Sequence, residues 1–201
     1  TTEVEITLPA ATLKGLLCVA GKTERRRYLN GVYFDPAGYA VATDGAAMLA
    51  VRLTAPFGGA GFLVPRAAIE TALKGLGARL VATSNVEVTR GRLTFIGGTA
   101  DFTPVDAQYP AWQRVIPLDP SGEAAHFDPA LVTRMDDGIR CIEGSRRFIP
   151  VVVPNGEASG VVLGALPAVL GVIMPIRTGE ADTDDAHDRI AAFLRPEPAK
   201  A

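Results

Sequence analysis

The clearest alternation of apolar and polar positions in this chain lies between Tyr28 and Gly45. Apolar and polar residues alternate up to a turn at 36–38, alternate again, and end at the dipeptide Asp44-Gly45. Two alternating segments on either side of a turn are typical of a β-hairpin in an antiparallel sheet. The pattern therefore predicts strands at about 28–35 and 39–43, followed by a third strand at about 48–53.

The same order of elements occurs three times along the chain. Each time a short extended segment precedes a proline, a helix with apolar residues on one face, and then three strands. The three helices begin at Pro9, Pro65 and Pro129, and Asp128 is a suitable N-cap for the third. The remaining strands are predicted at 3–8, 61–64, 78–83, 86–89, 92–96, 123–127, 147–153, 159–165 and 168–176. This repetition predicts one module used three times and an α+β fold with antiparallel sheets, each helix covering one face of a sheet.

Composition excludes several classes of protein. The chain has 201 residues, of which 48% are hydrophobic and 21% charged, as expected of one large or two small globular domains. No apolar segment reaches the ~18 residues of a membrane span, and no signal peptide is recognisable, so we expect a cytoplasmic protein without a membrane partner. The two cysteines form neither a disulfide framework nor a zinc site. We accordingly predict no cofactor and no metal.

Six segments, in order along the chain, carry a resemblance to a known family: EITLPAATLKGLL, RRYLNGVYF, AVATDG, FLVPRAAIETALKGL, YPAWQRVIP and GVIMPIR. They resemble the bacterial DNA sliding clamp, the beta subunit of DNA polymerase III. Residues 3–117 resemble the middle domain of the clamp, and residues 171–177 resemble the end of its final domain. The resemblance implies a DNA-clamp fold of repeated strand–helix–three-strand units, two per domain, whose helices line the inner wall of a ring.

The resemblance also suggests the domain boundaries. The resemblance implies that residues 1–117 form a clamp domain, residues 118–178 a shortened clamp-like half domain and residues 179–201 a tail, which together make about one and a half clamp domains. The first domain of the clamp has no counterpart, so two such chains cannot close the usual ring and we expect a homo-oligomer. One hypothesis is that the third units of two chains pair across a two-fold axis to complete a shared domain.

The function implied by the resemblance is that of a sliding clamp-like processivity factor. Its partners would be double-stranded DNA, bound without sequence specificity, and peptides of a DNA polymerase and a clamp loader. In the family these peptides dock into an apolar cleft between the middle and final domains, and apolar walls with a methionine suit peptides with hydrophobic anchors. The residues of this chain that match the cleft are Leu29, Thr43, Gly45, Leu49, Pro110, Arg114, Val115, Val172, Met174, Pro175 and Arg177.

One of these matches departs from the family pattern. The family follows the ATDG motif with a histidine or aromatic residue, an arginine and a leucine. This chain continues with Ala46, Ala47, Met48 and Leu49, which is one residue more. We expect Leu49 to take the role of the leucine, and the loss of the polar pair puts in doubt whether the peptides of the host fit.

Basic residues are candidates for contact with DNA. A sliding ring contacts phosphates weakly and reads no bases, so scattered lysines and arginines suffice. The candidates are Lys14, Lys22, Arg25, Arg66, Lys74, Arg79, Arg134 and Arg140. The net charge of −2 argues against a protein that grips DNA through many phosphate contacts, and the basic loop 22–27 is either a loop over the DNA or a solvated charged loop.

Two other classes of function compete with the sliding clamp. An enzyme is not expected, because Asp44, His126, Asp128 and His187 have no triad or metal spacing. The second is a clamp-like adaptor or decoy that binds replication proteins without encircling DNA, which the short chain and the net acidity favour.

The segment from Thr178 onward departs from the repeated module. An acidic stretch at 182–188 precedes the apolar residues Ile190, Phe193 and Leu194, a pattern that predicts a short helix on a flexible link. These apolar residues either dock into a cleft, of the same chain or of a neighbour, or are simply packed or frayed.

Overall fold

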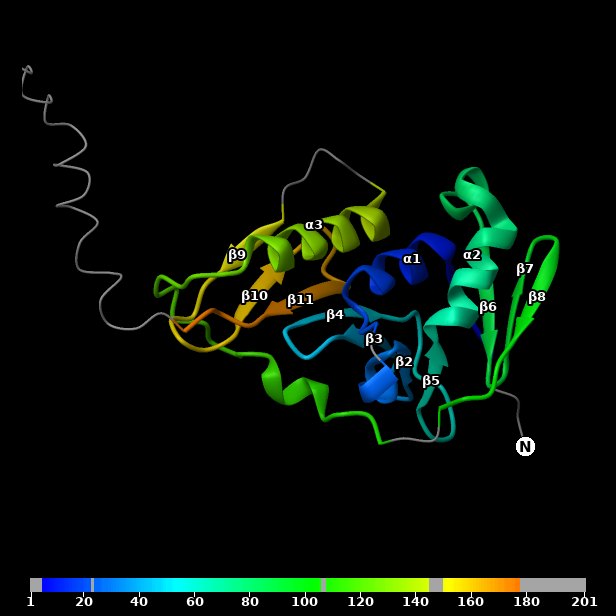
Figure 1. Cartoon of the computed structure of the whole chain (residues 1–201), viewed down its shortest axis with the longest axis horizontal. Coiled ribbons are helices and arrows are strands. Elements are labelled where there is room, and N and C mark those ends of the chain that lie inside the picture. Colours follow the sequence, from blue (N-terminus) through cyan, green and yellow to red (C-terminus); the bar gives the residue numbers. More distant parts are fainter. Residues whose placement is uncertain (1–4, 23, 106–107, 145–149, 178–201) are drawn as a thin grey trace, which may run out of the picture.

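The computed structural model describes residues 5–22, 24–105, 108–144 and 150–177, without the side chains of Glu24 and Arg25 (Figure 1). Its helices are α1 (Ala10–Val19), α2 (Arg66–Val81) and α3 (Pro129–Glu143), with short 3₁₀ helices η1 (Glu24–Leu29) and η2 (Trp112–Val115). Its strands are β1 (Ile6–Pro9), β2 (Gly31–Asp35), β3 (Tyr39–Thr43), β4 (Ala47–Arg52), β5 (Phe62–Pro65), β6 (Asn85–Thr89), β7 (Arg92–Phe95), β8 (Gly98–Asp101), β9 (Val151–Val153), β10 (Gly160–Leu163) and β11 (Val169–Ile173).

The predicted module of a helix followed by three strands is present three times. The first unit is β1-α1-β2-β3-β4 and the second is β5-α2-β6-β7-β8. The third is α3-β9-β10-β11, in which the predicted strand 123–127 is reduced to a single β-bridge between His126 and Ile176. The Asp128 side chain accepts a hydrogen bond from the Ala130 N–H at 2.8 Å, which confirms the predicted N-cap of α3.

The first two units exchange their first strands. Strand β1 pairs with β6, with Ile6 opposite Val88, and strand β5 pairs with β2, with Phe62 opposite Phe34. The strand orders are therefore β1-β6-β7-β8 in one sheet and β5-β2-β3-β4-β11-β10-β9 in the other. All of these strand pairs are antiparallel, which confirms the α+β class.

The seven-stranded sheet continues from the first unit into the third. Strand β4 pairs with β11 over five residue pairs, from Ala47 opposite Ile173 to Val51 opposite Val169. The sheet thus crosses the predicted domain boundary near residue 117, and Val172, one of the predicted cleft residues, lies at this β4–β11 junction.

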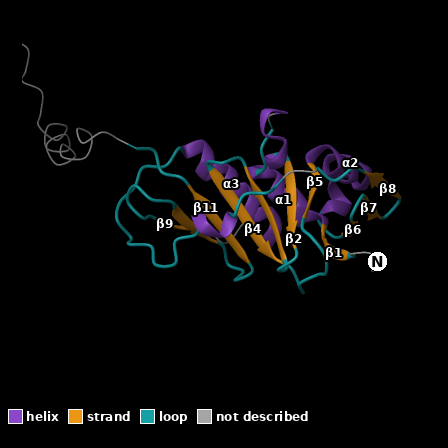
Figure 2. Ribbon diagram, turned by 90° about the horizontal axis from the view of Figure 1, so that it is seen from below, coloured by secondary structure: helices purple, strands orange, loops and turns teal. Residues whose placement is uncertain are grey.

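The three helices lie in a row on one side of the sheets, with α1 between α3 and α2 (Figures 1 and 2). Helices α1 and α3 cross with glycine against glycine. A Cβ atom at Gly15 would lie 2.5 Å from the carbonyl oxygen of Gly138, and one at Gly138 would lie 2.9 Å from the carbonyl oxygen of Gly15. Because no real Cβ approaches a backbone oxygen so closely, only glycine at both positions permits this crossing.

The start of the predicted hairpin differs from the expectation. Residues 28–30 are not part of a strand, because the chain forms η1 up to Leu29 and strand β2 begins only at Gly31. The reason lies in how near β2 comes to β5: a Cβ at Gly31 would lie 2.1 Å from the carbonyl oxygen of Val64. The sheet therefore begins where glycine allows the two backbones to meet.

The second difference concerns residues 78–83, which were predicted as a strand. Residues 78–81 continue helix α2 after a break at Gly77, whose φ of 69° lies in the left-handed region, and residues 82–83 form a turn. The helix is buried at Leu76 before the break and at Val81 after it, so the three strands of this unit are β6, β7 and β8. Of the predicted strands at 3–8 and 147–153, the described residues contain β1 and β9, and Glu5 and Pro150 are not in a strand. Residues 3–4 and 147–149 of these predictions lie outside the described residues.

Candidate functional site

The central strands of the seven-stranded sheet are apolar on both faces. In β4, Ala47, Leu49 and Val51 belong to the core beneath the helices, whereas Met48 and Ala50 belong to a second cluster with Trp112 on the opposite face. The second cluster exists because the segment 108–117 runs across that face of the sheet, opposite the helices (Figure 1). Burial of both faces explains why β4 reads as an unbroken apolar run rather than an alternating one.

Aromatic residues hold the crossing segment onto the sheet. The Tyr109 ring stacks on Tyr33, with ring centroids 4.2 Å apart, and Trp112 meets the edge of Tyr39 at 5.2 Å. The Trp112 indole N–H donates a hydrogen bond to Asp35 at 2.8 Å, so this buried ring has its polar atom satisfied. Burial, reinforced by the neighbouring Tyr33, raises the pKa of Tyr109 far above its ordinary value.

A cavity of about 240 Å³ lies between this segment, the junction of β4 with β11, and η1. Its walls are mostly apolar. Two large apolar lining residues are exposed to solvent, Val115 at 41% and Met174 at 43%. The lining residues are Arg26, Tyr28, Leu29, Thr43, Gly45, Ala46, Ala47, Met48, Pro110, Ala111, Trp112, Val115, Val172 and Met174.

The turn at 43–47 forms the rim of this cavity. The Thr43 hydroxyl donates to the Ala47 carbonyl at 2.7 Å and accepts from the Gly45 N–H at 3.0 Å. The φ of Gly45 is 96°, which a residue with a side chain rarely adopts, so glycine is needed at this rim position.

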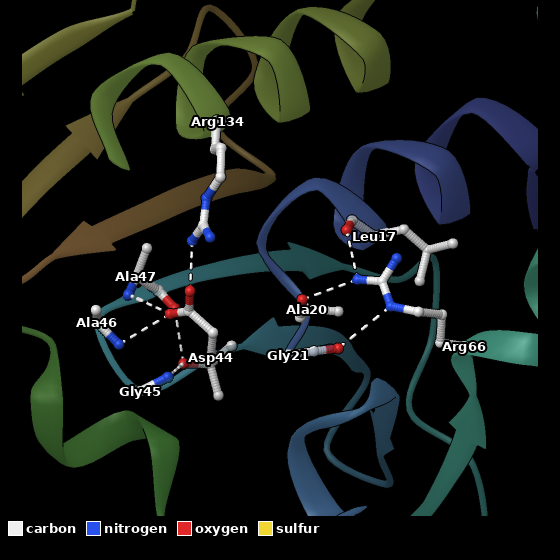
Figure 3. A network of polar contacts seen from close by, with 10 residues as sticks. Leu17, Ala20, Gly21, Asp44, Gly45, Ala46, Ala47, Arg66 and Arg134 are labelled. Carbon is white, nitrogen blue, oxygen red and sulfur yellow. Dashed lines mark hydrogen bonds and ion pairs between the residues drawn. The ribbon is translucent and has the colours of Figure 1, made fainter. Parts of the chain in front are cut away.

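Asp44 joins this rim to helix α3. One carboxylate oxygen accepts from the N–H groups of Ala46 and Ala47, each at 2.9 Å, and the other pairs with Arg134 (Figure 3). Burial raises the pKa of Asp44, but the hydrogen bonds from Arg134 and from the two backbone groups outweigh burial, so the pKa is lower than usual. The carboxylate is therefore ionised at neutral pH, and it connects the first unit to the third.

Seven of the predicted cleft residues line the cavity together: Leu29, Thr43, Gly45, Pro110, Val115, Val172 and Met174. Arg114, Pro175 and Arg177 are not among the residues that line it. Leu49 is placed wrongly by the sequence prediction, since it is fully buried under the crossing of α1 and α3, and Met48 faces the cavity in its place. The extra residue in this turn shifts the alternation by one, which moves the leucine to the other face.

Seven lining residues were not predicted: Arg26, Tyr28, Ala46, Ala47, Met48, Ala111 and Trp112. Met48 follows from strand alternation once the sheet is known to be covered on both faces. Trp112 belongs to the YPAWQRVIP segment. Its large aromatic side chain was the signal in the sequence that could have identified it as a lining residue.

The predicted DNA-contacting residues fall into two groups. Arg66 is a structural residue: its guanidinium donates to the carbonyl oxygens of Leu17 and Ala20, each at 2.8 Å, and of Gly21 at 3.2 Å (Figure 3). These contacts close the carboxyl end of α1, where carbonyl groups lack helical partners. Arg134 is held by Asp44, and Arg140 pairs with Asp136 at 2.7 Å.

Four of the remaining basic candidates are exposed. Lys14, Lys22, Lys74 and Arg79 are solvent-exposed and make no ion pair within the described residues, whereas the side chain of Arg25 lies outside the described part of the chain. The surface between α1 and α3 also carries Asp136 and Asp137 beside Lys14 and Arg140. The helical side therefore carries charges of both signs rather than a continuous basic surface.

Comparison with known proteins identifies the fold. The clamp chain of DNA polymerase III from Bartonella birtlesii, solved with griselimycin bound, superposes with a TM-score of 0.56 at 21% identity over 87% of this chain and 66% of that one. The clamp of Bacillus subtilis gives 0.59 at 13% identity over 89% and 65%, and that of Pseudomonas aeruginosa 0.56 at 17% over 87% and 67%. This chain therefore has the fold of the bacterial DNA sliding clamps and spans about two thirds of their length.

Other comparisons give no match. No protein-family model and no curated protein matches this sequence. Within the described residues, no helix is both long and apolar enough to cross a bilayer, and no three His, Cys, Asp or Glu side chains gather as they would around a metal ion.

Proposed function

We propose that this protein is a sliding clamp-like processivity factor that docks a peptide of a DNA polymerase or clamp loader in the cavity beside Met174. The observation that carries the proposal is the cavity itself, which seven of the residues implied by the clamp resemblance line together. Exposed apolar walls flanked by a backbone turn suit a peptide with hydrophobic anchors, and a methionine adapts to side chains of different shape. The chain acts in this proposal by binding, without catalysis.

The cavity is tested with griselimycin, the ligand in the Bartonella birtlesii clamp structure. Wild-type protein and the double variant Val115→Asp/Met174→Asp are titrated by calorimetry. Both substituted side chains are exposed, so the variant folds, and two carboxylates in the apolar wall weaken binding by about tenfold or more. The control is Ile96→Asp, an exposed apolar residue outside the cavity. Equal affinity of all three proteins, or no binding to any, contradicts a docking role for the cavity.

The second half of the proposal is weak contact of the helical side with double-stranded DNA, through Lys14, Lys74 and Arg79. These side chains come from α1 and α2, which lie in one row with α3 (Figure 1). We further propose that a homo-oligomer supplies the additional units that a ring requires. Retention of the protein on nicked circular DNA that is lost on linearisation supports a ring. Each Lys→Ala change is expected to reduce the slope of log binding constant against log salt concentration by about one unit.

A clamp-like adaptor that does not encircle DNA is the second candidate. The observation that favours it is the state of the arginines: Arg66 closes α1, and Arg134 and Arg140 pair with aspartates. Neutralised cations contribute little to phosphate binding, and the net charge of the whole chain is −2. An adaptor would retain peptide binding but show the same retention on circular and linear DNA.

A further inference from the structure

Large apolar side chains at the cavity and close to it in the chain are exposed to solvent. Val115 and Met174 line it, and Ile176, two residues beyond Met174, is 50% exposed. Exposed apolar side chains that border a cavity are typical of an interaction site. A partner for it must offer apolar anchors, and the question is which segment is nearest.

The chain itself continues from the edge of this cavity. Met174 lines the cavity, Ile176 donates its N–H to the His126 carbonyl at 2.7 Å, and Arg177 is the last described residue before 178–201. An extended chain spans up to about 3.5 Å per residue, so the roughly 13 residues from Arg177 to Ile190 can reach about 45 Å. This length is more than a return to the cavity requires.

The sequence of that segment is complementary to the cavity and its rim. Five acidic residues, Glu180, Asp182, Asp184, Asp185 and Asp188, precede apolar residues at the helical spacing i, i+3 and i+4: Ile190, Phe193 and Leu194. Arg26 lines the cavity, its chain neighbour Arg27 is exposed, and so is Lys22 just before η1. None of the three pairs with a carboxylate in the described part of the chain. The acidic residues of the segment are thus complementary to these cations, and its apolar residues are complementary to the apolar cavity.

We propose that residues 180–194 of this chain occupy its own cavity, with Ile190, Phe193 and Leu194 against the apolar walls and the acidic stretch beside Lys22, Arg26 and Arg27. The inference rests on the proposed docking role of the cavity and adds its regulation. A tethered occupant competes with any external peptide at an effective concentration of about a millimolar, so only ligands that bind well displace it. The segment then acts as a built-in competitor that sets a threshold for partners.

The test uses the full chain and a fluorescein-labelled synthetic peptide of residues 180–196. We compare wild-type protein, Phe193→Ser/Leu194→Ser, and the matched control Ala191→Ser/Ala192→Ser, which changes the other face of the same segment. The labelled peptide is expected to bind the Phe193→Ser/Leu194→Ser protein about tenfold more tightly than the other two, because its competitor has been removed. Equal affinity for all three proteins overturns the proposal.

Trp112 provides a second readout, because it is the single tryptophan of the chain and lines the cavity. Its emission is expected to shift to longer wavelength in Phe193→Ser/Leu194→Ser and not in the control. A difference between these proteins that disappears on about hundredfold dilution indicates a second copy as the occupant and overturns the intramolecular assignment.

Griselimycin separates failure of this inference from failure of the proposed function. If griselimycin binds the cavity with equal affinity in all three proteins, the docking role stands and the internal occupant is refuted. If neither griselimycin nor the labelled peptide binds any of them, both proposals fall. A final protein combines Phe193→Ser/Leu194→Ser with Val115→Asp/Met174→Asp. If the labelled peptide still binds this protein, the peptide binds outside the cavity, which also refutes the proposal that residues 180–194 occupy it.

Discussion

The two faces of the seven-stranded sheet are covered in different ways. On the face crossed by 108–117, aromatic contacts hold the segment in place and leave an apolar cavity open beside it. On the helical face, α1 and α3 pack until their backbones meet at Gly15 and Gly138, and the arginines close helix ends or join units. The comparison teaches that the two faces of one sheet can differ in what they leave exposed: one face leaves an apolar cavity open to solvent, whereas the other uses much of its charge in internal contacts.

The largest effect should come from the helix crossing. Gly15→Leu places a Cβ 2.5 Å from the Gly138 carbonyl oxygen and 2.5 Å from Ile142, and we expect a loss of roughly 3 kcal/mol or more in the free energy of unfolding. The measurement is urea unfolding followed by Trp112 fluorescence. Gly58→Leu is the control, because no atom lies within 4 Å of its added Cβ. A Gly15→Leu protein as stable as the control would show that the helices do not meet as described.

Substitution of Arg66 should give the next largest effect on stability. The same substitution tests whether Arg66 is a structural residue or a DNA-binding one. Arg66→Met removes hydrogen bonds to three carbonyl groups from a side chain that is only 15% exposed, which should cost about 2–3 kcal/mol of stability. Lys74→Met on the same helix should change stability by less than about 0.5 kcal/mol. If Arg66→Met leaves thermal stability unchanged and weakens DNA binding instead, the assignment of Arg66 to the end of α1 is wrong.

The Asp44–Arg134 pair should give the smallest effect, because both side chains are partly exposed. A double-mutant cycle with Asp44→Asn and Arg134→Met should yield a coupling free energy of about 1 kcal/mol. Because the pKa of Asp44 is lower in the folded state, its contribution is complete above the unfolded value near 4 and is lost as pH falls through the folded pKa. Asp44→Asn should flatten the acid limb of the stability–pH curve, and an unchanged limb would show that other carboxylates control it.

Much of the fold could be predicted, because its signals are local. Apolar spacing and proline positions identified three helices, and the turns that bound the hairpin and the strand after it placed β3 and β4 to within a residue. Residues 28–30 and 78–83 were assigned wrongly because tertiary contacts decide them: the β2–β5 approach at Gly31, and burial of Val81 after a break at Gly77 that would end an isolated helix.

The site was predicted in part for a similar reason. Thr43, Gly45 and Met174 were identified from short motifs, which do not depend on packing. Leu49 and Met48 exchanged roles because one added residue in a turn reverses which face each side chain meets. Arg66 looked like a surface cation because the sequence gives no sign that the end of α1 lies against the start of α2.

The exchange of β1 and β5 between the first two units has a practical consequence. A cut in the loop 53–61 would leave two fragments, each holding a strand in the sheet of the other. We expect such fragments to remain associated and, when produced separately, to reassemble like the halves of a split reporter, since neither can complete its own sheet alone.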